Sequence, residues 1–600
     1  YLSETVTVTA ANEINVVLKA SAGNMEEVVV VGYGTQKKAN LTGSVTNVNM
    51  EALSNRPIAD AGRGLQGVVP GLSVRIPSGE VGSDPLMRIR GFVGSIEGSS
   101  APLILVDNVE IPSIQMVNPN DIETITVLKD AAASSIYGAK AAFGVILITT
   151  KKGSKTEGAS LTYSNNFSIQ SPAKKIEVAG IDGLQYTLDA HNNMKQGGPA
   201  GGFWRINEES LAKAREWQEK YGNTIKWNDP VVYGRDWIFD GTDKYGYRIY
   251  DPVTAMVREN AFTQNHNVSV NGRSGNTRYN ASVGYLGQQG MMKPAKHDDF
   301  TRYTANLGIS TKVTDAITIR GSALFSDRTK RYANSLTGFG ADPWLYIYRW
   351  SRLFPTGVLE NGEELRDPYW DTKSAMTATL GQKYNNLNLG TTIDITKNWN
   401  IIADYTFDRR EEFLNSGVPE RWAREPWYTP VLLKDENGNQ IYVDENGNRT
   451  ETGGVPAYQF PLVNTVLKTN SNVYRSTFVE QRHTVNAYST YNLNINNDHQ
   501  IKAMLGTNIV AGKWTSHNSR RTELINYDNP QYSYGVGTDF VGGGANWDGL
   551  VGYFGRVNYA YNNKYLLEGN LRYDGTSKFP EHVRWMWYPS FSAGWVLSNE

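Results

Sequence analysis

"TRYNASVGYLG", residues 277–287, changes side-chain character at every second position. Apolar and aromatic residues fall on one face of an extended chain and polar residues or glycine on the other: Tyr279, Ala281, Val283 and Tyr285 against Arg278, Asn280, Ser282 and Gly284. Successive side chains of a β-strand point to opposite faces. This period of two therefore predicts a strand with one apolar and one polar face.

The same pattern continues from about residue 158 to the end of the chain, for example in "TRYTANLGIS" (301–310) and "AITIRGSALF" (316–325). Runs of about ten such residues are typical of transmembrane β-strands, although a soluble β-sandwich also alternates. The lengths of the connections distinguish a transmembrane barrel from a soluble β-sandwich. Short polar turns such as "TKNWN" (396–400) alternate with long excursions, at about 326–384, 409–482 and 512–549. This parity favours a mainly β fold, a transmembrane antiparallel β-barrel of which about twelve strands are present.

Composition excludes some classes of function. The chain has 59 Lys and Arg against 60 Asp and Glu, which argues against a nucleic-acid partner bound through a strongly basic surface. It has no cysteine, so it has no disulfide, thiol nucleophile or Cys-ligated metal; this reflects either chance or an oxidising compartment. No run of about 18 apolar residues predicts a transmembrane helix.

Both ends of the sequence are irregular. Tyr1 starts inside a strand-like pattern with no signal peptide before it, and Glu600 is not the aromatic residue that commonly ends a bacterial barrel. We therefore expect sequence to be missing at both ends. Residues 1–20 resemble the last strands of a small β-sandwich, and a small-residue linker follows them.

Two helices are predicted. The segment "DAAASSIYGAKAAFG" (130–144) is rich in alanine, with Asp130 as its N-cap and Gly144 near its end. It lies in a mixed α/β region, residues 37–155. The segment 200–222 places Leu211, Ala214 and Trp217 on one helical face, and we expect it to decorate a loop outside the barrel.

Motifs of catalysis and metal binding do not occur. The seven histidines are scattered, and neither a G-x-S-x-G elbow nor a phosphate-binding P-loop is present. We predict no enzyme activity, no cofactor and no metal site. "KDENGN" (434–439) and "VDENGN" (443–448) depart from the EF-hand pattern, and Asn-Gly is typical of hairpins, so we expect exposed turns there and leave calcium open.

The stretch "EEVVVVGYGT" (26–35) looks like a buried strand entering a dinucleotide-binding turn. However, Lys37 occupies the position of the third glycine, and the β-like sequence after it offers no helix N-terminus for a pyrophosphate. Both features argue against a nucleotide-dependent oxidoreductase, and a nucleotide titration would settle the question.

Several motifs resemble a known family. They are "MEEVVVVGYGTQKKANLTGSV" (25–45), "LQGVVPGLSV" (65–74), "RIRG" (88–91), "PLILVDNVE" (102–110) and "NPNDIETITVLKDAAASSIYGAKAAFGVILITTKKG" (118–153). In order and spacing they are similar to the SusC-like (SusC/RagA) TonB-dependent outer-membrane transporters of Bacteroidetes. One departure is "DNV" (107–109), where the family usually has an Asp-Gly-Val turn.

The resemblance implies a domain order. Residues 1–20 would end a carboxypeptidase-regulatory-like domain, 21–36 would be a linker with a TonB-box-like segment, 37–155 a plug inside the lumen, and 156–600 about half of a 22-stranded barrel in the outer membrane, in contact with its lipid. A passive porin would need neither plug nor TonB box.

The resemblance also implies a function. We expect TonB-dependent active import of an oligosaccharide or a peptide, as the transporter subunit of a SusCD-like complex. The expected partners are a SusD-like surface lipoprotein and the TonB–ExbB–ExbD complex. The alternative is a siderophore- or cobalamin-type TonB-dependent receptor that lacks the lipoprotein lid.

Three sets of residues are candidates for these roles. A free valine-rich strand can pair edge-on with TonB, which predicts contacts at Glu26, Glu27, Val28, Val29, Val30, Val31, Gly32 and Tyr33. Charged plug residues that could pair with the polar barrel lining are Arg88, Arg90, Asp107, Lys129 and Asp130. Aromatic rings in the long excursions could bind the ligand: Trp344, Tyr348, Trp350, Tyr369, Trp370, Trp422 and Trp427.

Overall fold

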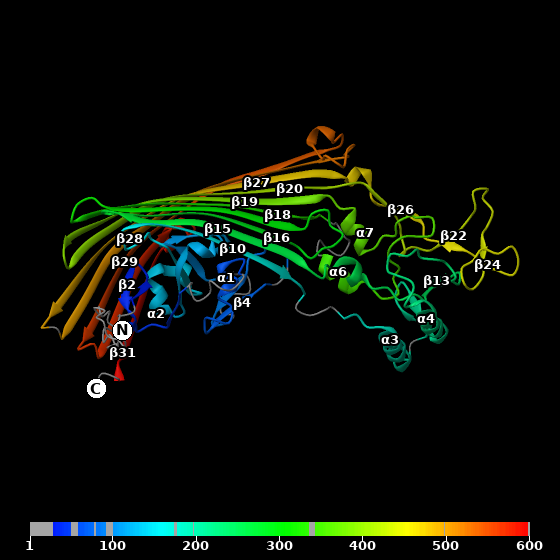
Figure 1. Ribbon diagram of the computed structural model, residues 1–600, viewed down its shortest axis with the longest axis horizontal. Coiled ribbons are helices and arrows are strands. Elements are labelled where there is room, and N and C mark those ends of the chain that lie inside the picture. Colours follow the sequence, from blue (N-terminus) through cyan, green and yellow to red (C-terminus); the bar gives the residue numbers. More distant parts are fainter. Residues whose placement is uncertain are drawn as a thin grey trace, which may run out of the picture.

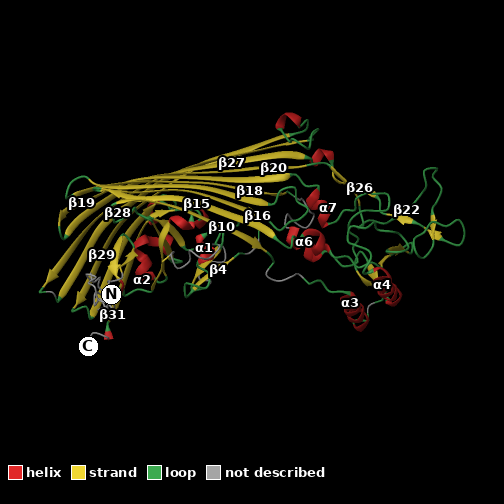
Figure 2. Ribbon diagram, in the orientation of Figure 1, coloured by secondary structure: helices red, strands yellow, loops and turns green. Residues whose placement is uncertain are grey.

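The computed structural model (Figure 1) describes residues 28–49, 58–76, 80–91, 100–172, 177–195, 197–334, 343–496 and 498–597. Its largest element is an antiparallel sheet of twelve strands in which each strand pairs with the next, as the sequence predicts. The strands are β10 (Gly158–Gln170), β15 (Ala261–Ser274), β16 (Thr277–Gln289), β17 (Asp299–Lys312), β18 (Ile317–Ala333), β19 (Thr377–Thr396), β20 (Trp399–Val418), β27 (Asn472–Ile495), β28 (His499–Thr522), β29 (Asp539–Tyr561), β30 (Tyr565–Thr576) and β31 (Trp585–Trp595). The sheet curves around a smaller N-terminal domain (Figures 1 and 2).

The two faces of this sheet have the burial expected of a membrane barrel. On β17, the polar residues Arg302 and Thr304 are 2% and 5% exposed. The apolar side chains of Tyr303 and Leu307 on the other face of the same strand are 53% and 52% exposed. A soluble sandwich would bury the apolar side chains instead. Here the polar face surrounds the inner domain and the apolar face points outward, which is the arrangement of a transmembrane barrel.

The strands are longer than the sequence analysis expected. β27 and β28 have 24 residues each, although about 9–11 residues suffice to cross a bilayer. The long excursions are correspondingly shorter than predicted, since β18 continues to Ala333 and β19 begins at Thr377. The strands thus carry their connections well beyond the membrane at the long-loop end.

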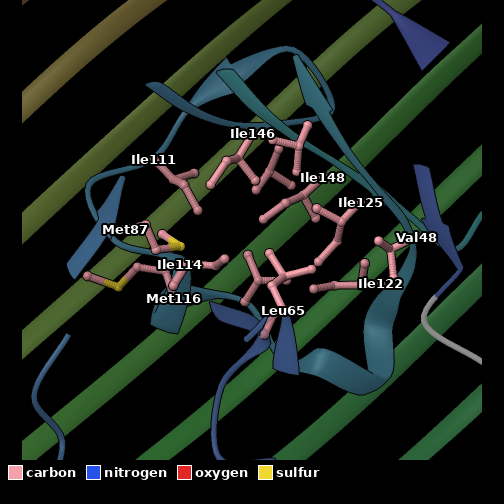
Figure 3. Close-up of a cluster of buried hydrophobic side chains, with 14 of the residues drawn as sticks. Val48, Leu65, Met87, Ile111, Ile114, Met116, Ile122, Ile125, Ile146 and Ile148 are labelled. Carbon is pink, nitrogen blue, oxygen red and sulfur yellow. The ribbon is translucent and has the colours of Figure 1, made fainter. Parts of the chain in front are cut away.

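The inner domain is a plug with its own sheet and core. Its main sheet has the order β3 (Val45–Asn49), β8 (Ile122–Leu128), β9 (Val145–Thr150), β6 (Leu103–Val106) and β7 (Val109–Glu110), beside helix α1 (Ala61–Gly64) and the pair β4 (Leu72–Arg75) and β5 (Leu86–Ile89). Ile125, Ile146 and Ile148 project from the sheet toward Leu65 and Ile114 (Figure 3). In this core cluster only Leu324 and Tyr384 come from the barrel wall.

The predicted helix over 130–144 is wrong in length. Asp130 does cap helix α2 (Ala131–Ser134), its carboxylate accepting the Ala133 N–H at 2.8 Å. A 3₁₀ segment, η5 (Ser135–Ala141), follows and is interrupted at Gly138, whose φ is 70°. The reason is close packing: a Cβ at Gly138 would overlap the Asp574 carboxylate of the barrel.

Three of the long excursions, the first of them between β10 and β15, fold together outside the barrel. We call residues 177–258, 343–376 and 419–471 the outer subdomain, which lies at the far end of the molecule from the plug (Figure 1). Its helices are α3 (Ile181–Asn193), α4 (Glu208–Tyr221), α5 (Pro252–Met256), α6 (Pro343–Arg349) and α7 (Pro368–Lys373). Its strands are β11 (Ala200–Gly201), β12 (Arg205–Ile206), β13 (Trp237–Phe239), β14 (Lys244–Gly246), β21 (Arg421–Arg424), β22 (Val431–Leu432), β23 (Tyr442–Val443), β24 (Val455–Pro456), β25 (Tyr458–Gln459) and β26 (Leu462–Val466). In the part of the chain that the structure describes, no helix is long and apolar enough to cross a membrane.

One apolar core joins the three excursions. Leu211 of the first, Leu365 of the second and Phe460 of the third belong to the same buried cluster. Helix α4 confirms the prediction over 200–222, with Leu211, Ala214 and Trp217 buried on one face. The two Asn-Gly sequences form tight turns, as predicted. In each turn an aspartate, Asp435 or Asp444, accepts backbone N–H groups of the residues two and four positions later.

Candidate functional site

The valine-rich stretch forms a hairpin that the plug and the barrel enclose. Strand β1 (Val28–Val31) pairs antiparallel with β2 (Gly34–Lys37), and Gly32 and Tyr33 form the turn. Val29, Val31 and Tyr33 are 1%, 2% and 3% exposed. The expectation of a free strand is therefore corrected: the strand exists, but β2 occupies one of its edges and the packing around it covers its buried face. Glu26 and Glu27 lie outside the described residues.

An aromatic cage holds the turn of the hairpin. The Tyr33 ring stacks on Phe554 of β29, with the ring centroids 4.4 Å apart, and lies 5.5 Å from both Tyr137 and Tyr488. Gly32 has φ 64°, in the left-handed region that favours glycine. Beside it, Arg556 Nη1 donates to the Val31 carbonyl at 3.1 Å. The barrel wall thus fixes the turn by stacking and by one charged hydrogen bond.

Arginines of the wall hold one side of the plug. Arg328 of β18 donates to the Asp84 carboxylate at 3.1 Å and to Ser113 Oγ at 3.2 Å. Arg302 of β17 donates to the Gln115 carbonyl at 3.2 Å, and Lys330 pairs with Glu80. Both arginines are nearly fully buried, and their charge is directed at polar atoms of the plug.

A second set of wall residues holds the α2–η5 segment. Arg572 Nη1 donates to the Ile136 carbonyl at 2.6 Å, and its Nε donates to Asp574 at 2.6 Å. Ser135 and Ser590 share a hydrogen bond of 2.6 Å between their hydroxyls. Gly138 fits into this set because it has no side chain, so the plug backbone reaches the wall directly.

A third contact is an ion triad. Glu110 of the plug accepts from Lys140 at 2.6 Å and from Arg482 of β27 at 3.2 Å. Burial by itself raises the pKa of Glu110, but the two cations outweigh it and hold the pKa below its ordinary value. The carboxylate is therefore charged at neutral pH and ties the plug to β27.

These contacts define the seat of the plug, the polar surface at which the plug meets the wall. The main apolar core of the plug includes only two wall residues, Leu324 and Tyr384, whereas the contacts described above are mostly hydrogen bonds and ion pairs. Water can replace such bonds, and each hydrogen bond that involves a charged group contributes only about 1.5–3 kcal/mol net. Two apolar contacts are exceptions: the cluster around Tyr33, and Val81 of the plug packed with Leu286 and Phe300 of the wall. Most of the main apolar core nevertheless belongs to the plug itself.

The predicted plug residues are placed differently. Asp107 accepts from the Thr150 N–H, Lys129 Nζ donates to the Pro70 carbonyl and Asp130 caps α2, so these recorded bonds lie within the plug. Arg88 is half-buried in β5 and Arg90 is exposed at its end. The "DNV" departure is explained by Asn108, whose φ of 69° takes the left-handed conformation that glycine would supply.

Sequence reasoning missed the residues that form the seat. On the plug these include Glu80, Asp84, Glu110 and Ser113, and on the wall Arg302, Arg328, Arg482, Arg556 and Arg572. The wall arginines lie at inward-facing positions of strands in which polar and apolar residues alternate. The period of two in the sequence could therefore have identified them. The plug residues lie in loops and short elements without a recognisable period.

The seven aromatic side chains predicted to contact the ligand differ in their exposure to solvent. Trp350 and Trp370 are 3% and 4% exposed and belong to the interior of the outer subdomain. Trp427 packs against Trp350, while Trp344 and Tyr369 pack against a buried methionine cluster. Tyr348 and Trp422 are 67% and 55% exposed. Only these two of the seven present most of their side chain to solvent.

Comparisons with known proteins agree with this architecture. The sequence profile of the TonB-dependent Receptor Plug Domain matches residues 37–145. The TonB-dependent receptor SusC of Bacteroides thetaiotaomicron is 27% identical over 98% of this chain and 53% of its own length. The TonB-dependent receptor P26 of Formosa agariphila is 27% identical over 100% of this chain and 53% of its own length.

The chain is similar to the SusC-like TonB-dependent receptors. It spans about half the length of the curated relatives it matches. Among solved structures, the RagAB peptide importer in the 'open-open' state aligns with a TM-score of 0.69 at 21% identity, over 96% of this chain and 59% of the other. The siderophore receptor PirA of Acinetobacter baumannii aligns with a TM-score of 0.50 at 13% identity, over 95% and 61%. These structures show a shared plug-and-barrel fold, and this SusC-like chain is an outer-membrane β-barrel protein.

Proposed function

We propose that the chain is the transporting subunit of a TonB-dependent importer, which carries a peptide or an oligosaccharide across the outer membrane. The observation that carries the proposal is the seat of the plug. A separately folded plug, held to the wall mainly by bonds that water can replace, is suited to being moved by a small applied force. A static barrier would be better served by an apolar seat, whose exposure to water is costly.

Energy would enter through the segment before the plug. TonB, driven by ExbB and ExbD, would bind at or near residues 26–33, where Val28–Val31 already has the extended conformation that strand pairing requires. Because β2 occupies the edge of β1 in this structure, TonB would either replace β2 or bind the residues before Val28. In both cases the pull reaches the plug through β1.

Ligand capture would occur at the long-loop end. A SusD-like surface lipoprotein would cover the lumen there, in keeping with the similarity to SusC and to the RagAB peptide importer. The exposed rings of Tyr348 and Trp422 are the candidate contacts for sugar rings or for peptide side chains. The buried Trp350 and Trp370 would act indirectly, by shaping the outer subdomain.

Uptake by intact cells tests this function. Cells with and without the full-length protein would be grown on defined peptides as the only nitrogen source and on defined oligosaccharides as the only carbon source. We expect one of these two media to require both the protein and TonB. Growth on both media without the protein, together with a requirement for it under iron limitation, would favour the siderophore-type alternative. Affinity purification from native membranes would show whether a surface lipoprotein accompanies the protein.

A further inference from the structure

Two cavities lie on either side of Tyr33 along the same wall. The smaller, about 40 Å³, is lined by Tyr33, Asn108, Arg482 and Thr484 among others, and the larger, about 540 Å³, by Tyr33, Asn108, Tyr488 and Thr490 among others. We call them the upper and the lower cavity. Residues 482, 484, 488 and 490 of β27 all point into the lumen, because they share the parity of its buried polar positions. Along β27, the residues that line the upper cavity therefore come first, and Tyr488, which contacts Tyr33, and Thr490 in the lower cavity follow.

Each cavity has a distinct outlet. The upper cavity lies beside the Glu110–Lys140–Arg482 triad, where Lys140 and Glu110 retain 37% and 35% of their side-chain exposure. The lower cavity extends to Lys151 and Gly153 near the short-turn end of the barrel. Its wall offers amide and hydroxyl groups, such as Asn306, Asn388 and Thr490, beside the charged Arg320, Asp404 and Lys502. The amide and hydroxyl groups both donate and accept hydrogen bonds, which suits a peptide backbone or a sugar.

Tyr33 fills the space between the cavities. Its ring contacts Tyr137 of the plug on one side and Phe554 and Tyr488 of the wall on the other. Since Tyr33 and Asn108 line both cavities, the barrier there is about one side chain thick. We propose that Tyr33 is the gate residue of the transport path, and that this path runs along the inner wall of β27 and β28, the strands that line both cavities.

The hairpin explains how a pull would open this gate. On the β2 side, Gln36 donates to Glu568 at 3.2 Å, and just beyond, Thr42 shares a hydrogen bond of 2.7 Å with Ser592. The β1 side is held by its four pairs with β2 and by Arg556 at the Val31 carbonyl. Force applied before Val28 therefore opens the hairpin one pair at a time, from Val28 opposite Lys37 to Val31 opposite Gly34. Tyr33 leaves its cage next, while the plug core is still folded.

This gate rests on the proposed function, but its test needs neither nutrient nor TonB. The full-length protein, purified in detergent, would be inserted into planar lipid bilayers, and its potassium conductance measured without partners. Tyr33→Ala, which empties the barrier, should show conductance steps that the wild type lacks. Tyr33→Phe, which keeps the stacked ring, should stay closed. Tyr303→Ala is the matched control, since it removes an outward-facing tyrosine of β17 that is 53% exposed.

A second pair of measurements guards against misfolding of the Tyr33 variant. Phe554→Ala removes the ring from the wall side and leaves the plug sequence intact, and it should also conduct. Thr490→Cys places the only cysteine of the chain in the lower cavity. A charged thiol reagent added at the long-loop side should modify this cysteine only when combined with Tyr33→Ala. Closed channels in both alanine variants with an unmodified cysteine would overturn the proposal, as would equal conductance in Tyr303→Ala.

Discussion

Gly138 of the plug lies against Asp574 of the barrel so closely that no side chain fits between them. Its φ of 70° and ψ of −153° interrupt the segment after α2, and the Arg572 guanidinium beside it binds the carbonyl of Ile136. The plug therefore contacts the wall through its backbone at this point. Contacts of this kind depend on the absence of a side chain, and they make the seat of the plug sensitive to single methyl groups.

Gly138→Ala should loosen the plug. The added methyl group overlaps Asp574, and the left-handed backbone adds strain, for a combined cost of about 1–3 kcal/mol. Limited proteolysis of the full-length protein in detergent would measure the cutting rate within residues 37–145. Gly67→Ala is the matched control, because Gly67 also has a positive φ, 75°, but an added Cβ there meets no atom within 4 Å. Equal cutting in the two variants would show that the overlap has no effect.

Two wall arginines should differ in importance. Arg572→Met leaves Asp574 buried without its cation, since the two side chains are 2% and 7% exposed, and we expect a loss of about 3–5 kcal/mol. Arg328→Met leaves Asp84, which is 50% exposed and remains solvated, so the loss of that pair should be about 1 kcal/mol. Urea-induced release of the plug, followed by the rate of proteolysis within residues 37–145, would rank them. The opposite ranking would contradict the role of burial.

The outer subdomain should unfold independently of the barrel. Trp237 and Phe460 stack with centroids 4.2 Å apart and are 2% and 0% exposed. Phe460→Ala should destabilise this core by about 3–5 kcal/mol through lost burial and the cavity left behind. On intact cells, external protease should then cut residues 177–258, while the barrel keeps its heat-dependent gel mobility. Tyr442→Ala, at an exposed position of the same region, is the control and should leave the cutting rate unchanged.

The outer subdomain should also be more stable in acid than in base. Asp367 caps α7, is 0% exposed, and accepts the N–H groups of Trp370 and Gly357 at 2.6 and 2.7 Å. Burial raises the pKa of Asp367 to about 7, above the ordinary value of about 4. The folded state thus favours the protonated form, and its contribution to stability is complete below pH about 4 and lost as the pH rises through 7. Protease resistance should fall between pH 5.5 and pH 8, and Asp367→Asn should remove that dependence. An unchanged pH profile in the variant would exclude Asp367 as the cause.

Local patterning is enough to predict the barrel wall. Arg302 and Tyr303 are neighbours in sequence, but Arg302 is buried and Tyr303 is exposed. The period of two by itself assigns each side chain to its face of the sheet. Helix α4 is predictable for the same reason, since its apolar residues recur at helical spacing. In both cases the information lies within one element.

Contacts between distant segments are not predictable in this way. Trp350 looks like an exposed loop residue until Phe354 and Trp427 are placed around it, and Trp427 comes from a different excursion. Likewise, Val28–Tyr33 has the pattern of a free strand, and only the positions of Phe554 and Tyr488 show that it is enclosed. Burial that depends on the meeting of segments hundreds of residues apart leaves no local period in the sequence.

The central claim, that the plug must move for transport, can be tested with one measurement. Residues 1–600 contain no cysteine, so a pair of substitutions among them introduces one defined disulfide in this part of the protein. The pair Ser135→Cys and Ser590→Cys joins plug to wall where the two hydroxyls are 2.6 Å apart, whereas Thr277→Cys and Thr311→Cys joins two wall strands at 3.0 Å. With the disulfides formed, ligand uptake by cells should stop in the first variant, recover on reduction, and continue in the second. Undiminished uptake through a barrel whose plug is fully cross-linked would contradict this account.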